Sequence, residues 1–121
     1  MKKILVWAIF IFWLWFIWFA ASQPGLTSGF SLEVDTFGRK AIHFLIYFTL
    51  TYWGYRVLTQ HQVKYALFWA FIFALVYAAT DEYHQSFVFG RNGSPIDWGI
   101  DTLGAVLFIF LQGRNLDFKI F

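Results

Sequence analysis

The chain has 121 residues, of which 60% are hydrophobic and only 13% are charged, and its formal net charge at pH 7 is +2. An average soluble domain carries about 25% charged residues, and a soluble domain of this size could not bury 17 Phe, 7 Trp and 6 Tyr in one core. The composition therefore excludes intrinsic disorder and a coiled coil, and the absence of cysteine excludes a disulfide scaffold and thiolate chemistry. A small all-α integral membrane protein remains, with too little charge to argue for nucleic acid.

Four apolar stretches predict a bundle of four transmembrane helices. A spanning helix needs roughly 20 residues, and none of the stretches alternates polar with apolar residues as a membrane β-strand does. The first stretch is longer and bulkier than the apolar region of a signal peptide, which favours a retained helix. The predicted helices cover residues 4–21, 41–58, 65–87 and 95–111, in a single domain of residues 1–121.

The connections between these helices are short, with one exception. Residues 22–40 are predicted to form an external loop, whose partly amphipathic second half lies over the membrane surface or caps the bundle. The third apolar stretch, residues 65–80, rises only about 24 Å, so we expect its helix to continue through the polar segment that begins at Asp81. Ser94 is a predicted N-cap for the fourth helix, with Pro95 at its first position.

The distribution of charge predicts that both termini are cytoplasmic. With this N-in/C-in topology, six basic residues lie inside and three lie outside, as the positive-inside rule requires. Six of the seven acidic residues then fall toward the outer face of the membrane. The polar residues are therefore expected to gather at the extracytoplasmic end of the bundle.

Three of the predicted helices carry polar residues at this end. Ionisable groups inside a membrane are expensive and normally face the bundle interior, paired with one another or with a ligand. Carboxylates gathered there cannot all ionise freely, so a shared proton or a bound cation is expected. The predicted cluster comprises Lys40, His43, Tyr47, Asp81, Glu82, His84, Gln85, Asp97 and Asp101, with Arg91 and Ser94 in the adjoining loop.

These residues also have plainer explanations. Asp81 and Asp97 could be helix-boundary caps or ion-pair partners of Arg91, without any ligand. His43 could be a satisfied polar residue between two helices, and the Trp and Tyr residues near helix ends fit an interfacial belt. The functional hypothesis rests on convergence, because so many charged groups at one end exceed what capping four helices needs.

The order and spacing of these residues resemble the VanZ-like family of small bacterial membrane proteins over most of the chain. The resemblance is carried by Lys40-x-x-His43-x-x-x-Tyr47, Asp81-Glu82-x-His84-Gln85-x-Phe87, Gly90-Arg91-x-x-Ser94, Asp97, Asp101 and Gly104. Phe89 and Thr102 depart from the family pattern, but neither departure removes a charged position. The resemblance implies a multi-pass protein of the bacterial cytoplasmic membrane. It also implies a link to tolerance of teicoplanin, a lipid-tailed glycopeptide, in a family without a settled biochemical activity.

Three functions are compatible with these residues, and the first is binding. The cluster would hold the head group of a lipid or lipid-linked envelope molecule at the outer leaflet. Lys40 and Arg91 would pair with its phosphate, while the acids and His43 would orient those bases. The ligand-binding candidates are Lys40, His43, Tyr47, Asp81, Glu82, His84, Gln85, Arg91, Ser94, Asp97 and Asp101.

The second function is an enzyme that acts on a phosphate or amide of an envelope lipid, and the third is a structural partner subunit of an envelope complex. The enzyme could hold a divalent metal, zinc or manganese, with Asp81, His84, Asp97 and Asp101 as ligands. Without metal, histidines would carry the acid–base chemistry. The catalytic candidates are Glu82, His43 and His84.

Overall fold

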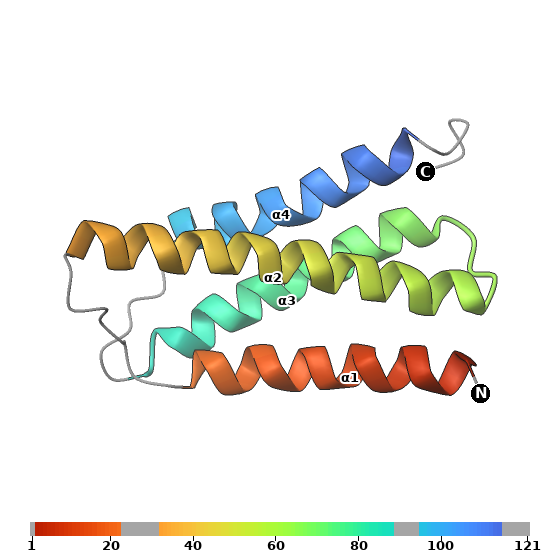
Figure 1. Ribbon diagram of the computed structural model, residues 1–121, viewed down its shortest axis with the longest axis horizontal. Helices are drawn as coiled ribbons and strands as arrows, with labels where there is room; N and C mark the ends of the chain where they lie inside the picture. The colour runs from red at the N-terminus through yellow and green to blue at the C-terminus, as the bar shows by residue number, and fades with distance from the viewer. Residues whose placement is uncertain (1, 23–31, 89–94, 115–121) are drawn as a thin grey trace.

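The computed structural model describes residues 2–22, 32–88 and 95–114, with side chains from Phe37 onward in the second range. These residues fold as four α-helices without strands (Figure 1). The helices are α1 (Lys2–Ala21), α2 (Leu32–Gln60), α3 (Ala66–Gln85) and α4 (Pro95–Gly113). The predicted all-helical class is therefore confirmed for the described residues, and α3 does continue through the polar segment.

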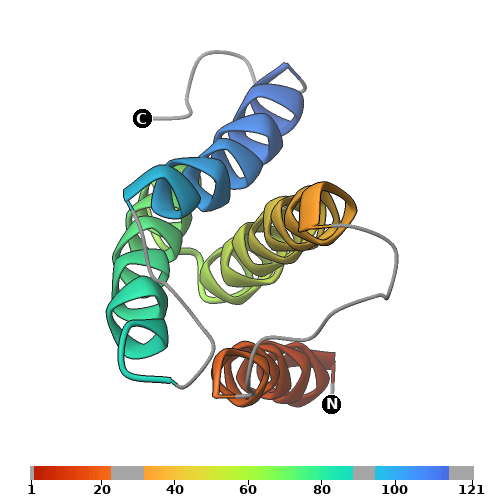
Figure 2. The same ribbon diagram turned by 90° about the vertical axis from the view of Figure 1, so that its left-hand side faces the viewer.

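The helices alternate in direction, and α2 lies at the centre of the bundle. Both α2 and α3 contact the three other helices, whereas the backbones of α1 and α4 do not approach each other within the described residues; seen end-on, α2 lies between the others (Figure 2). The start of α1, the α2–α3 connection and the end of α4 lie together at one end, which we call the turn end (Figure 1). The opposite end, where α3 ends at Gln85 and α4 begins at Pro95, is called the polar end.

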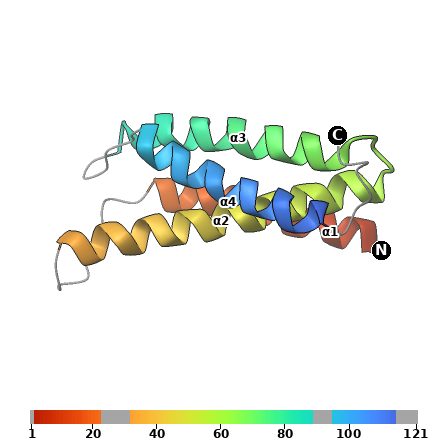
Figure 3. The same cartoon turned by 90° about the horizontal axis from the view of Figure 1, so that it is seen from above.

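The second helix is longer than predicted. It begins at Leu32 instead of residue 41, and its first turns project beyond the other helices at the polar end (Figure 1, Figure 3). The prediction of an external loop over residues 22–40 is therefore wrong for residues 32–40, which do not lie across the end of the bundle. The physical reason is that this segment contains no proline, so an existing helix extends through it at one added hydrogen bond per residue.

Large apolar side chains cover the outside of the bundle. Ile4, Val76 and Phe110 are between 60% and 72% exposed, and many other large apolar residues accompany them. Soluble monomers rarely expose apolar surface on this scale. Helices α1, α3 and α4 are each long and apolar enough to cross a membrane, whereas polar residues such as His43 and Arg56 interrupt the apolar part of α2. Both observations support membrane-spanning helices.

Hydrogen bonds to backbone carbonyls join α1 to its two neighbours. Trp13 Nε1 donates to the carbonyl oxygen of Ile46 on α2 at 3.1 Å, and the Tyr77 hydroxyl of α3 donates to the carbonyl oxygen of Leu14 at 2.7 Å. Buried Trp and Tyr polar atoms need such partners, because lipid tails offer none. Tyr77 lies one turn before Asp81 on α3, and its hydroxyl is directed toward α1.

Small residues set the distance between helices. Ala70, Ala74 and Ala78 of α3 are each 1% exposed, as expected for a stripe that lets helices approach closely. A close approach joins α2 and α4, where a Cβ added to Gly104 would collide with the backbone carbonyl oxygen of Phe44. The two backbones therefore meet at Gly104, in the middle of α4.

We predict that Gly104→Ala destabilises the fold and that Gly99→Ala does not. The first substitution forces α2 and α4 apart and should lower the free energy of unfolding by about 1–3 kcal/mol. The second places a Cβ with no neighbouring atom within 4 Å and should stabilise α4 by up to about 1 kcal/mol through helix propensity. Unfolding of both variants in detergent, followed by tryptophan fluorescence, tests the difference; equal effects would contradict the close contact.

Candidate functional site

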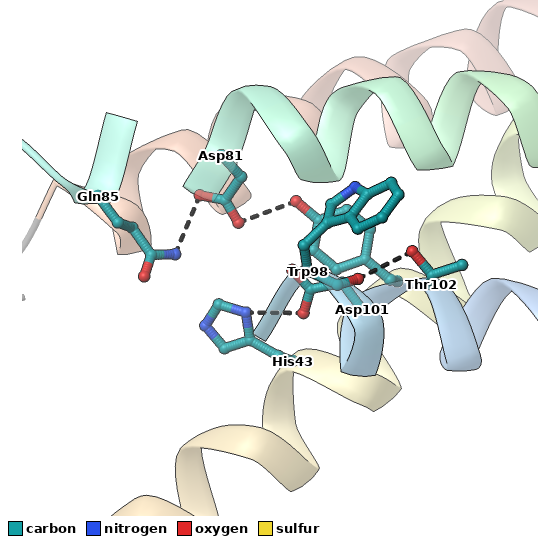
Figure 4. A network of polar contacts seen from close by, with 7 residues as sticks. His43, Asp81, Gln85, Trp98, Asp101 and Thr102 are labelled. Carbon is teal, nitrogen blue, oxygen red and sulfur yellow. Dashed lines mark hydrogen bonds and ion pairs between the residues drawn. The ribbon is translucent and has the colours of Figure 1, made fainter. Parts of the chain in front are cut away.

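Helices α2, α3 and α4 bring four ionisable side chains together inside the polar end. They are His43 from α2, Asp81 and Glu82 from α3, and Asp101 from α4. Each offers one nitrogen or oxygen atom, and these atoms all lie within 4.8 Å of one another. We call these four residues the acidic cluster. Figure 4 shows His43, Asp81 and Asp101 extending from three different helices toward a common point.

The contact between His43 and Asp101 joins α2 to α4. Nδ1 of His43 lies 3.0 Å from Oδ1 of Asp101, whose side chain is fully buried (Figure 4). Gly104 follows Asp101 on α4 by three residues, and Phe44 follows His43 directly on α2. The backbone contact between Gly104 and Phe44 therefore holds the imidazole and the carboxylate within hydrogen-bonding distance.

Two hydrogen bonds fix the orientation of the Asp81 carboxylate. The Tyr47 hydroxyl donates to Oδ2 at 2.8 Å, and Nε2 of Gln85 donates to Oδ1 at 3.2 Å. Tyr47 and Gln85 are themselves buried, with 1% and 4% of their surface exposed. Both oxygens of Asp81 thus have a donor, one from α2 and one from the next turn of α3.

The charge in the cluster is not balanced by the donors around it. Oδ2 of Asp101 is buried without a hydrogen-bond partner among the described residues. Asp81 and Glu82 are only 2% and 7% exposed, so water does not screen them well. For charges separated by 4.8 Å, and with an effective dielectric constant of about 20, two ionised carboxylates repel each other by about 3 kcal/mol. The cluster therefore requires protons or a cation.

His84 faces a different helix from the cluster. Its ring stacks on Trp18 of α1, with ring centroids 3.8 Å apart and an angle of 11° between the planes. Nε2 of His84 lies 3.4 Å from the Ser22 hydroxyl, at the end of α1. Residues 81 and 84 share one side of α3 by spacing, but the structure directs Asp81 to α2 and α4 and His84 to α1. The sequence groups His84 and Asp97 with Asp81 and Asp101 as candidate metal ligands. The structure instead brings His43 and Glu82 together with Asp81 and Asp101.

Lys40 and Asp97 lie near the cluster without belonging to it. Lys40 is partly exposed one turn before His43, toward the projecting end of α2, and makes no hydrogen bond or ion pair with a described side chain. Asp97 is partly buried one turn before Asp101 on α4. The predicted ligand residues Arg91 and Ser94 lie outside the described residues.

Sequence reasoning did not identify the two tryptophans that border this site. Trp18 covers the ring of His84. Nε1 of Trp98, a residue labelled in Figure 4, donates to the carbonyl oxygen of Leu75 at 3.1 Å, which joins α4 to α3. An interfacial belt predicts tryptophan near helix ends, but it does not predict which neighbour each ring meets. That choice depends on the rotation of each helix about its axis.

We predict that Tyr47→Phe destabilises the protein through Asp81. The substitution removes the hydroxyl donor from a buried carboxylate oxygen, which should lower the free energy of unfolding by about 1–3 kcal/mol. Tyr83→Phe serves as the matched control, because Tyr83 is 69% exposed and its change should stay within about 0.5 kcal/mol. Denaturant titration in mixed micelles measures both, and the prediction fails if the two variants unfold alike.

Comparison with known protein families places these residues in a wider group. A family model described as VanZ/LLP1 matches residues 6–113, a range that includes the whole acidic cluster. No curated protein and no solved structure matches the chain. The match reaches from the first turns of α1 to the last residue of α4 and covers far more than half of the sequence. The chain therefore belongs to the VanZ/LLP1 family.

Proposed function

We propose that this protein binds the phosphate-bearing head group of a lipid or lipid-linked envelope molecule at the polar end of its bundle. The polar end lies in the outer leaflet of the bacterial cytoplasmic membrane. The observation that carries the proposal is the buried acidic cluster, which is set in a bundle whose outer surface is otherwise apolar. Ionisable residues are kept at such depth chiefly where they serve a ligand, an ion or a partner.

Lys40 supplies the positive charge for the phosphate. It shares a side of α2 with His43, since the two residues are three positions apart, and it lies one turn closer to the projecting end of the helix. Its ammonium group is a compact point charge of the kind that binds phosphate. Arg91 is proposed as the second residue that contacts the phosphate. Its place in the sequence, between the end of α3 and the start of α4, supports this role.

An apolar groove between α3 and α4 suits the tail of such a lipid. Its volume is about 460 Å³, and its lining consists of Tyr65, Phe68, Trp69, Phe71, Val106 and Ile109. At 1.5 Å per residue, Phe71 lies roughly 15 Å along α3 from Asp81. The hydrocarbon of one leaflet is roughly 15 Å deep, so the chain of a lipid with its head group at the cluster reaches the near end of the groove at Phe71. The rest of the groove extends from there toward Tyr65 at the turn end.

The orientation of the bundle has its own test. The chain contains no cysteine, so single cysteines can be introduced without background. We expect Ser86→Cys, at the polar end of α3, to react with a membrane-impermeant maleimide in intact cells. Val63→Cys, in the connection at the turn end, should react only after the membrane is permeabilised. The reverse pattern would place the cluster on the cytoplasmic side and refute the outward-facing site.

Mass spectrometry of lipids that co-purify with the gently solubilised protein tests the head-group site. We expect one phosphate-bearing lipid class to be enriched with the wild type and reduced at least fivefold in Lys40→Ala and Arg91→Ala, since each loses a phosphate partner. Arg56→Ala removes an exposed positive charge near the turn end and should retain the lipid. Bulk lipid alone in all four samples would refute the proposal. A lipid that is chemically altered by the wild type but not by Glu82→Gln would indicate turnover instead of binding.

Binding of an envelope lipid also offers a physical route to glycopeptide tolerance. A lipid-tailed glycopeptide anchors in the same leaflet as the proposed ligand, so a protein that sequesters or re-presents a surface lipid changes what the drug meets there. This route requires the outward orientation and the head-group site together, and it depends on both preceding experiments.

A further inference from the structure

We infer that the acidic cluster is a binding site for one divalent transition-metal ion, with His43, Asp81, Glu82 and Asp101 as its ligands. The inference rests on the proposed function and deepens it, because a bound cation gives the head-group phosphate a positive partner inside the cluster. Without a cation, only neighbouring bases such as Lys40 would offset the negative charge of these four residues.

The spacing of the donor atoms fits a metal ion. Four candidate ligand atoms from three helices lie within 4.8 Å of one another. In a tetrahedral site with bonds of about 2.1–2.2 Å, the ligand atoms are about 3.4–3.6 Å apart. Donors separated by up to 4.8 Å therefore have to approach one another by about 1 Å when an ion binds. One imidazole with three carboxylates is a donor set that suits manganese or zinc.

A second, independent observation comes from Asp101. Its residue surface is 0% exposed, its Oδ2 atom is buried without a hydrogen-bond partner among the described residues, and its other oxygen contacts His43. A buried carboxylate oxygen that lacks a donor is costly unless a proton or a cation satisfies it. His43 and Asp101 extend toward each other from the neighbouring helices α2 and α4, and each offers a candidate ligand atom within 4.8 Å of those of Asp81 and Glu82 (Figure 4).

The surroundings of Asp81 resemble the outer shell of a metal site. Carboxylates that bind metals are usually held by further hydrogen bonds, which fix their orientation. Asp81 receives one such bond from Tyr47 and one from Gln85, and both donors are buried. Tyr47 and Gln85 are therefore positioning residues, which act on the ion through Asp81.

Burial favours a metal ion over an amine as the cation. Asp81, Glu82 and Asp101 are all less than 10% exposed. An amine that belongs to a lipid head group has to bring its attached carbon chain into this closed space. A bare ion carries no such substituent, and it can be reached by four donors at once.

The experiment is a metal titration of the full chain in detergent that has been depleted of lipid. After treatment with a chelator, Mn²⁺ is added, and free Mn²⁺ is measured by electron paramagnetic resonance. We expect one Mn²⁺ site per chain, competition by Zn²⁺, and little competition by Ca²⁺, which prefers oxygen-only sites. Binding should also raise the thermal unfolding temperature of the wild type.

Asp101→Asn and Asp97→Asn form a matched pair on α4, one turn apart and with the same chemical change. We expect Asp101→Asn to weaken Mn²⁺ binding at least tenfold and to abolish the thermal shift, while Asp97→Asn changes the affinity less than twofold. Glu82→Gln repeats the test on α3, should Asp101→Asn fail to fold. The inference is overturned if the wild type binds neither Mn²⁺ nor Zn²⁺, if Asp97→Asn loses as much affinity as the cluster variants, or if Ca²⁺ competes as well as Zn²⁺.

This outcome is separable from the head-group proposal. Metal binding is measured without lipid, whereas lipid retention is measured on Lys40→Ala and Arg91→Ala, which leave the four candidate ligands intact. Metal binding without an enriched lipid would keep the ion site and remove the head-group function. An enriched lipid in protein that binds no metal would keep the head-group function and remove the ion site.

Discussion

Burial of three carboxylates in an apolar bundle is the constraint on which the rest of this structure depends. Asp81, Glu82 and Asp101 come from two helices and are buried. Neighbouring side chains have to supply the hydrogen bonds that water would give to an exposed carboxylate. In surroundings made of lipid and aromatic rings, a carboxylate without a partner would be expelled or neutralised. The position of the polar end, the approach of α2 to α4 and the choice of buried donors all follow from the need to keep these groups inside.

The fold meets that constraint by making α2 the central helix. α2 contacts the three other helices and contributes His43 and Tyr47 one turn apart, one for each buried aspartate. Gly104 allows the backbone of α4 to approach α2 beside this pair. A side chain at that position would widen the gap and lengthen the contact between His43 and Asp101. Packing and electrostatics are therefore coupled at one level of the bundle, and a change in either is expected to affect both.

The same geometry links the two proposals made for this protein. A site with three carboxylates and one histidine is negative, so it attracts phosphate only through a cation or through neighbouring bases. Lys40 stands at the outer edge of the site, whereas the four candidate metal ligands lie deeper, between the helices. If both proposals hold, a head group at this end would meet the Lys40 ammonium first and the ion behind it. The long first part of α2, which projects beyond its neighbours, forms one side of that approach (Figure 3).

The sequence by itself determined the class of the protein, its four helices and its family, because long apolar runs and the spacing of Lys40, His43, Asp81 and Asp101 are local properties of the chain. It did not determine the start of α2, since helix extension over residues 32–40 depends on propagation from the helix that follows. Only the tertiary structure decided which polar residues meet. Spacing puts Asp81 and His84 on one side of α3. In the structure, however, the side chain of Asp81 is directed to α2 and α4, whereas the ring of His84 stacks on Trp18 of α1. The rotation of each helix is set by packing against the others, at contacts such as Gly104 with Phe44, and a single chain read in order carries no measure of that rotation.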